Sequence, residues 1–351
     1  MQTDMHYYGT YVMARAAGLS AAVAQVIATA AEYVDDSDYV ALALNDGVLL
    51  EALATAHHPV NVENLEEIDQ RKVWVPFHFF PGNEGETFEE RLMCRMDGKL
   101  AQEMVAHHLA QNDLGFNLEL MGVAAHVYAD TFSHYGFSGI SSDLNRVDPD
   151  SITLHVKNHS ILDYIKGKFE AFSNKYLSGK AATAVALGHG SVSTYPDRPY
   201  LAWSFKYTTS GISSGERVNQ QTFLVACQKL HEMFFTFAKA HPDSCDSISA
   251  CNFSDIQNAV AQVLAVEGSM DARIEAWQNA VAAGNIYPNP NKESIPVYAK
   301  KFNEDIEIFR SHSFETIKST DGYAFLAAAK FHRDYVIDEL LPKYELHVLV
   351  T

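Results

Sequence analysis

The sequence is short of cysteines and of basic residues, and each shortage excludes a class of protein. Only four cysteines occur in 351 residues, and no two have the C-x-x-C spacing of a thiolate zinc knuckle. Lysine and arginine number 26 against 44 acidic residues, which gives a formal net charge of −18. Such a chain repels the phosphate backbone of nucleic acids unless bound cations reverse the sign locally. These two shortages argue against a cysteine-rich zinc domain and against a nucleic-acid partner.

Long apolar runs are also lacking. No stretch reaches the roughly 18 uncharged apolar residues that a membrane span needs. The first residues, MQTDMHYYGTYVMARAAG, do not have the basic and then apolar order of a signal peptide. We therefore expect a soluble, cytoplasmic protein, with a secreted form that has lost its leader as the alternative. Cys245 and Cys251 would form a disulfide in an oxidising compartment and remain free thiols in a reducing one.

Apolar residues recur at helical spacing over most of the chain and predict a mainly α fold. The helical patterns cover residues 11–17, 21–34, 87–111, 117–135, 160–176, 217–239, 254–283, 295–310 and 323–341. Residues 38–58 favour a β-hairpin around an Asn-Asp-Gly turn, with a helix as the competing interpretation. Residues 73–80 are expected to be extended because they contain a proline among aromatic residues. Residues 186–215 are rich in Gly, Ser, Pro and Thr and predict a long, functional or mobile loop.

These patterns suggest one domain. We expect a helical core over residues 1–215, with a β-hairpin insertion near residues 38–80. The helices of residues 216–351 would pack on the same domain. The core part contains the strongest candidates for chemistry.

The run His126-Val-Tyr-Ala-Asp130-Thr-Phe-Ser-His134 is the sharpest of these candidates. Each step of four residues advances the face of an α-helix by only about 40°, so the three polar side chains share one stripe. The surrounding segment is apolar, which places the stripe in the interior, where an unpaired carboxylate is costly. Imidazole and carboxylate are zinc ligands, and an aspartate can bridge two ions. A His–Asp–His hydrogen-bond network without metal is the alternative, and three members in register favour the metal.

Further candidate ligands are scattered from the start of the chain to the mid-chain loop. They are Asp4, His6, Asp35, Asp36, His78 and His189, with Asp197 shortly after the last of these. The paired aspartates end a predicted helix, where acidic groups oppose the helix dipole and favour a compensating cation. A solvated acidic loop is the alternative for them. A rival late cluster, in a more polar context, is formed by His155, His159 and Asp163.

The order of these residues resembles that in the zinc-dependent phospholipase C/P1 nuclease superfamily, most closely its phospholipase C-like branch. That superfamily is all-helical and binds up to three zinc ions. Matched residue by residue, the resemblance implies a ligand set of His6, Asp35 or Asp36, His78, His126, Asp130, His134 and His189. His159 with Asp163 is the competing choice for the late ligands.

The sequence departs from the superfamily in four respects. The secreted members bind zinc through the amine and carbonyl of a terminal tryptophan, whereas residue 1 here is Met1, so that either Asp4 substitutes or one metal is absent. The gap from Asp130 to His134 is shorter than in the best-known secreted members. The predicted hairpin is an insertion, and the residues beyond 215 have no recognised counterpart.

The resemblance implies a metal-dependent phosphoric ester hydrolase with two or three zinc ions, although iron or manganese would accept the same ligands. A metal-bound hydroxide would attack a phosphodiester, such as a phospholipid or a small phosphoester. Asp35 or Asp36 would act as ligand and general base, and Asp130 would bridge ions. Arg198 is either a phosphate clamp or a surface arginine in a turn between prolines.

Two alternatives remain open at this stage. The first is a helical metal-binding or scaffold protein without catalytic turnover. The second is a metal phosphohydrolase of the HD type, and the lack of any His-Asp dipeptide in the chain counts against it.

Overall fold

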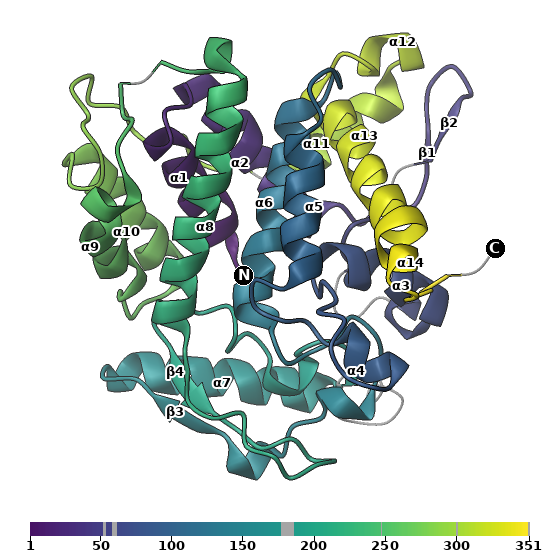
Figure 1. Cartoon of the computed structure of the whole chain (residues 1–351), viewed down its shortest axis with the longest axis vertical. Helices are drawn as coiled ribbons and strands as arrows, with labels where there is room; N and C mark the ends of the chain where they lie inside the picture. The colour runs from purple at the N-terminus through teal and green to yellow at the C-terminus, as the bar shows by residue number, and fades with distance from the viewer. Residues whose placement is uncertain (52–53, 58–61, 177–185, 247, 300, 350–351) are drawn as a thin grey trace.

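The computed structural model describes residues 1–51, 54–57, 62–176, 186–246, 248–299 and 301–349 (Figure 1). These residues are mainly helical with two small sheets, which confirms the predicted fold class. In the first half of the chain the helices are α1 (Thr10–Ala16), α2 (Ala21–Asp36), α3 (Glu67–Phe77), α4 (Phe88–Leu92), α5 (Lys99–Leu109), α6 (Asn117–His134) and α7 (His159–Tyr176). In the second half they are α8 (Asn219–Ala240), α9 (Phe253–Leu264), α10 (Met270–Ala282), α11 (Lys301–Ser311), α12 (Phe314–Ile317), α13 (Asp321–Asp334) and α14 (Leu341–Lys343). Two π-helical stretches, Asp4–Gly9 and Tyr335–Leu340, adjoin α1 and α13.

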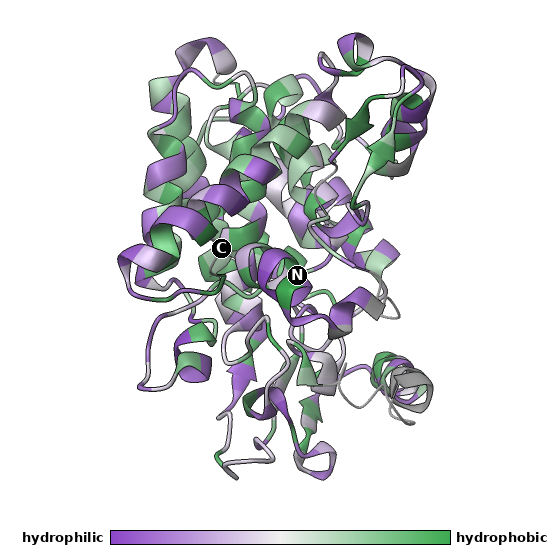
Figure 2. Cartoon of the chain, turned by 90° about the vertical axis from the view of Figure 1, so that its right-hand side faces the viewer, coloured by the Kyte–Doolittle hydropathy of each residue, from purple (hydrophilic) through white to green (hydrophobic). Residues whose placement is uncertain are grey.

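Helix α6 is the centre of the molecule. It packs against α2, α5, α8 and α13, so elements from both halves of the sequence enclose it (Figure 1). The contact with α2 is especially close, because a Cβ added at Gly122 would lie 2.4 Å from the carbonyl oxygen of Ile27. In Figure 2 individual helices carry both hydrophobic and hydrophilic colour, as expected when one side faces the core and the other faces solvent.

The two sheets are small and antiparallel. Strands β1 (Leu42–Ala43) and β2 (Leu49–Leu50) form the predicted hairpin, with Leu42 opposite Leu50. Strands β3 (Thr153–His155), β4 (Ala202–Ser204) and β5 (Arg217–Val218) form a three-stranded sheet with β4 in the middle. This sheet lies with α7 at one end of the molecule (Figure 1). Strand β4 falls within residues 186–215, which therefore do not form an uninterrupted loop.

Three local predictions were wrong. The expected helix over residues 254–283 is divided into α9 and α10, because the chain leaves the helix after Leu264 and Ser269 caps a new one. Long-range contacts explain the other two differences. Residues 73–77 are helical rather than extended, because burial of Val73, Val75 and Phe77 outweighs the local preference around the proline. The expected helix over residues 87–111 is divided into α4 and α5. Between them the backbone of Cys94 pairs with the carbonyl of Phe137 and the N–H of Gly136, which withdraws this segment from helical hydrogen bonding.

The hydrophobic core has two parts, and the functional candidates lie where they meet. The larger part contains most of α6, including Ala125 and Ala129. The smaller part surrounds the three-stranded sheet and includes Phe79 and Phe137, which follow α3 and α6 directly. All four cysteines are free thiols. Among the described residues, no helix has both the length and the apolar character required to cross a membrane.

Candidate metal centre

The three polar residues of the α6 motif lie on one buried stripe, as the spacing predicts. His126 and Asp130 have no exposed surface, and His134 is 4 % exposed. The end of the stripe is held by Arg217 of β5, which donates hydrogen bonds to the carbonyls of Ser133 and Tyr135. A cation placed on the last carbonyls of a helix also interacts favourably with the helix dipole. The position of His134 is thus fixed from outside its own helix.

Four imidazoles around this stripe are oriented by backbone carbonyls. His78 Nε2 donates to Thr55 O at 2.8 Å, and His126 Nδ1 donates to Ala31 O at 2.7 Å. His134 Nδ1 donates to His78 O at 2.8 Å, and His189 Nδ1 donates to Ser193 O at 2.6 Å. A neutral imidazole has one donor and one acceptor nitrogen, so each bond leaves a lone pair on the other nitrogen. This arrangement is typical of histidines that bind metals.

The first group of ligand atoms is formed by two of these lone pairs and two carboxylates. His78 Nδ1 and His126 Nε2 lie 3.3 Å apart, and they are 3.4 Å and 3.3 Å from Asp130 Oδ2. Asp35 Oδ1 completes the group at 3.8 Å and 4.0 Å from the same two nitrogens. Four acceptors that face one small space repel one another unless a cation lies between them. Asp35 has a side chain that is 35 % exposed, so this group reaches the surface.

His6 belongs to the π-helical stretch at the start of the chain and lies on the other side of Asp130. Its Nε2 lies 3.2 Å from Asp130 Oδ1, and its ring stacks on that of His126 with centroids 3.7 Å apart. Within the described residues neither ring nitrogen of His6 has a hydrogen-bond partner, although the ring is completely buried. Burial, together with His126 and the nearby amine, lowers the pKa of His6 to about 3. The imidazole is therefore neutral, and an unsatisfied neutral imidazole is a good metal ligand.

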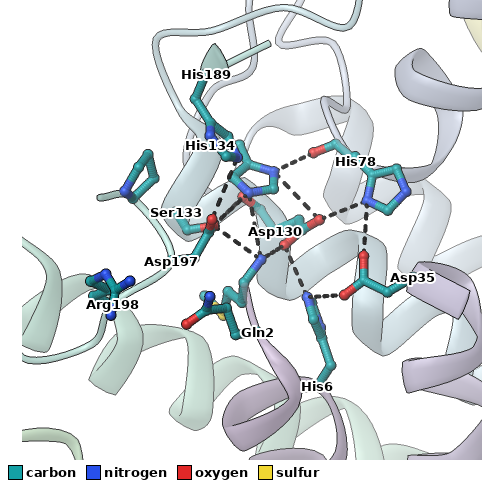
Figure 3. Close-up of polar contacts among 12 residues, drawn as sticks. Gln2, His6, Asp35, His78, Asp130, Ser133, His134, His189, Asp197 and Arg198 are labelled. Carbon is teal, nitrogen blue, oxygen red and sulfur yellow. Dashed lines mark hydrogen bonds and ion pairs between the residues drawn. The ribbon is translucent and has the colours of Figure 1, made fainter. Parts of the chain in front are cut away.

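A further group lies beyond the end of α6. His134 Nε2 is 3.0 Å from Asp197 Oδ1, and His189 Nε2 is 3.6 Å from Asp197 Oδ2. Asp130 Oδ2 is 3.4 Å from His134 Nδ1, so the same aspartate contacts both sides of the centre (Figure 3). The amino group of Met1 forms an ion pair with Asp130 and lies 3.5 Å from both Asp197 Oδ1 and His134 Nε2.

The charges of the centre are not balanced by the described residues that form it. Asp35, Asp130 and Asp197 contribute three negative charges, and the Met1 amine contributes one positive charge. Burial raises the pKa of Asp130, but His134, the amine, His126 and His6 together hold it well below its usual range. Burial likewise opposes ionisation of Asp197, and His189, the amine and His134 outweigh it, so its pKa is also lowered. Bound divalent cations would supply the missing positive charge, so the donor set fits one or more metal ions.

Most of the ligands proposed from the sequence converge. His6, Asp35, His78, His126, Asp130, His134 and His189 all belong to the three neighbouring groups, together with Asp197. The structure thus favours His189 and Asp197 over the rival late cluster, whose members His155, His159 and Asp163 are exposed.

Two predicted ligands are placed elsewhere. Asp4 forms an ion pair with Arg273 of α10 at 2.9 Å and does not reach the centre. The Met1 amine lies beside Asp130 at the centre. Asp36 accepts a hydrogen bond from the hydroxyl of Tyr298. The resembling superfamily uses a terminal amine, for which Asp4 was expected to substitute here, and a separate group of His57, Glu63 and Asp69 was not predicted. That group includes a 2.8 Å contact between His57 Nε2 and Asp69 Oδ2.

The family model that matches the chain covers residues 1–340, and its description is a family of unknown function, DUF6765. The chain belongs to the DUF6765 family. No curated protein and no solved structure matches it. The activity of this DUF6765 chain must therefore be argued from its own residues.

Proposed function

We propose that this DUF6765 chain is a metal-dependent phosphoric ester hydrolase that holds two or three divalent ions, zinc in preference to iron or manganese, and cleaves a phosphodiester. The observation that carries the proposal is the lone-pair arrangement at His78 and His126. Both imidazoles are locked by backbone carbonyls, and their free nitrogens lie 3.3 Å apart against the carboxylate of Asp130. A hydrogen-bonded network without metal would need a second proton on at least one of these imidazoles, whereas neutral imidazoles present only lone pairs to one another.

The sharing of one aspartate between neighbouring groups favours catalysis over a purely structural metal. Asp130 Oδ1 faces a ring nitrogen of His6, and Asp130 Oδ2 faces the free nitrogens of His78 and His126. Ions held side by side in this way can neutralise a phosphate, polarise it and lower the pKa of a bound water. The partly exposed Asp35 lies at the accessible edge of the first group, where it is suited to accept a proton from the attacking water.

Zinc is favoured because the ligands combine imidazoles with carboxylates, and iron or manganese would accept a similar set. The proposed substrates are small phosphoesters or phospholipid head groups. The net charge of −18 disfavours long nucleic acids, whose many phosphates would meet an acidic surface. The relation to the phospholipase C/P1 nuclease superfamily remains part of this proposal and is supported by the order of the ligands along the chain.

The proposal is tested by hydrolysis of bis(4-nitrophenyl) phosphate by the zinc-loaded full chain. We expect release of nitrophenolate that a chelator abolishes and added zinc restores. The double substitution His126→Ala, Asp130→Ala should reduce the rate by at least about a thousandfold, because it removes ligands from every ion that Asp130 contacts.

The chain offers a control with the same spacing. His159 and Asp163 repeat the H-x-x-x-D pattern on α7 but are exposed, so His159→Ala, Asp163→Ala should leave hydrolysis unchanged. Metal retained without any hydrolysis would contradict the enzyme and support the alternative of a metal-binding protein without turnover.

A further inference from the structure

A basic pocket adjoins the candidate metal centre, in contrast to the acidic character of the whole chain. The pocket has a volume of about 360 Å³. It is lined by Gln2, Tyr164, Lys168, Ser193, Thr194, Arg198, Met270 and Arg273. The lining contains three cationic side chains and no carboxylate. Arg273 forms an ion pair with Asp4, whose carboxylate also lies near enough to Arg198 to interact with it electrostatically. Among the described residues, Arg198 and Lys168 form no ion pair with a carboxylate.

Arg198 is the central cation of the pocket. It is only 5 % exposed, so the interpretation of this residue as a surface arginine was wrong. One terminal nitrogen donates to Thr194 Oγ1 at 3.0 Å, and the other makes a long 3.4 Å contact with the hydroxyl of Tyr200. Within the described residues, the buried Nε has no hydrogen-bond partner. A buried guanidinium without a carboxylate partner is costly, and an anionic ligand would remove that cost.

The other lining groups are also donors or cations. Arg273 donates to Gln2 Oε1 at 2.7 Å, which leaves the amide nitrogen of Gln2 as a donor to a ligand. Lys168 and Arg198 both lie near the ring of exposed Tyr164, at 5.6 Å and 5.7 Å from its centroid. The pocket thus has an exposed side near Lys168 and a buried side near Arg198.

The pocket and the metal centre share their supporting backbone. Arg198 follows Asp197, and Gln2 follows Met1, whose amine contacts Asp130 and Asp197. Consecutive Cα atoms are about 3.8 Å apart, so pocket and centre are neighbours. Figure 3 shows Gln2 and Arg198 beside the ligand cluster. Ser193 has a positive φ of 49°, and in this unusual conformation its carbonyl orients His189 while its side chain lines the pocket.

The loop that carries Arg198 is held rigidly. The side-chain amide of Asn219 donates to the carbonyls of Tyr195, Pro196 and Arg198. A preorganised cation adjacent to a metal centre can bind a group on the substrate at a fixed distance from the reacting bond.

We propose that this pocket binds a second anionic group of the substrate, so that the preferred substrates are phosphodiesters that also carry a phosphate monoester. The inference rests on the proposed phosphodiesterase function. Arg198, Lys168 and the amide of Gln2 bind the second phosphate, while the metal centre binds the phosphodiester to be cleaved. This adds a determinant of specificity to the chemistry of the metal ligands.

The test compares two chromogenic phosphodiesters that differ only at the far end, 4-nitrophenyl propyl phosphate and 4-nitrophenyl 3-phosphonopropyl phosphate, at pH 8. For the zinc-loaded wild type we expect kcat/KM to be at least about tenfold higher for the phosphono compound, chiefly through KM, because charge-assisted hydrogen bonds are strong. Arg198→Met should bring the ratio close to one, because the pocket then no longer distinguishes the two compounds. Equal kcat/KM values for the two compounds in the wild type would overturn the inference while the hydrolase remained.

Two further variants keep the test informative if Arg198→Met does not fold. Lys168 is exposed, so Lys168→Met should fold normally and reduce the ratio about threefold. Arg310→Met removes an exposed arginine from α11 and should leave the ratio unaltered. If Lys168→Met and a correctly folded Arg198→Met both keep the wild-type ratio of kcat/KM values, the pocket does not bind the second anionic group.

The inference and the proposed function can fail separately. If the wild type cleaves neither compound, calorimetric binding of propylphosphonate decides about the pocket. The anion pocket is supported without the hydrolase if Arg198→Met abolishes the binding of propylphosphonate and the double variant His126→Ala, Asp130→Ala still binds it. Binding that does not depend on Arg198 would contradict both.

Discussion

At the scale of single residues, the capacity to bind metal depends on the direction of lone pairs. His78 directly follows α3 and His126 lies in α6, and each donates one N–H to a backbone carbonyl of another segment. Their remaining nitrogens face the same carboxylate, Asp130. Histidines in an ordinary buried network pair donor with acceptor, whereas these pair acceptor with acceptor. The need for a cation therefore follows from hydrogen bonds that lie outside the centre itself.

Glu119 is a buried acid in the first turn of α6, and its burial leads to a prediction about how stability depends on pH. Burial and the neighbouring Asp321 raise its pKa from 4.5 to about 7. The folded state then binds a proton more tightly than the unfolded state, so this residue lowers stability as pH rises from about 4.5 to 7. Glu119→Gln cannot ionise, and its free energy of unfolding relative to wild type should increase by about 2 kcal/mol between pH 4.5 and pH 8.

Urea unfolding at several pH values measures this difference. Glu103 provides a control of opposite sign, because its contacts with Lys343 and Tyr344 lower its pKa despite burial. Glu103→Gln should therefore lose stability relative to wild type as pH rises. A pH-independent difference for Glu119→Gln would contradict the assigned burial of its charge.

At the scale of elements, the close packing of α2 on α6 positions two of the ligands. Asp35 lies in the last turn of α2, and the carbonyl of Ala31 in the same helix orients His126 of α6. Gly122 allows this approach, since an added Cβ would lie within 3 Å of Ile27 O, Ala30 Cβ and Ala31 N. Neither helix could present its ligands in this geometry if the two were farther apart.

We therefore expect Gly122→Ala to lower the free energy of unfolding by about 2 kcal/mol through overpacking. It should also weaken zinc binding, because separation of the helices moves the carbonyl of Ala31 away from His126. Gly167 in α7 is a matched control, since an added Cβ there meets nothing within 4 Å. Gly167→Ala should stabilise the protein by about 0.5–1 kcal/mol through helix propensity alone. Chemical unfolding and zinc titration of both variants check this, and equal effects would show that the packing of α2 on α6 is not critical.

At the scale of the whole molecule, the sequence predicted what depends on local spacing and missed what depends on distant contacts. The α6 stripe follows from helical periodicity alone, so His126, Asp130 and His134 were placed correctly on one face. The predicted conformation of residues 73–77 was wrong because tertiary burial decides it. The break between α4 and α5 was missed because it depends on pairing of Cys94 with residues after α6.

The same distinction applies to the candidate site. The convergence of His6, His78 and His189 could be proposed only through the order of ligands in a resembling superfamily. The partnership of Asp4 with Arg273 was invisible, because 269 residues separate the two and no local pattern couples them. Arg273 also shows that the second half of the chain contributes to the surroundings of the centre, by lining the basic pocket.

Binding of divalent metal through the α6 stripe underlies both the proposed hydrolysis and the role of the pocket, and it can be measured as metal stoichiometry. Elemental analysis of untagged, purified wild type should give two or three ions of zinc, or of iron or manganese, per chain. His126→Ala, Asp130→Ala should lose most of this metal, while His159→Ala, Asp163→Ala retains it. A wild type free of transition metals after exposure to zinc, or a double variant of α6 with undiminished content, would contradict the account.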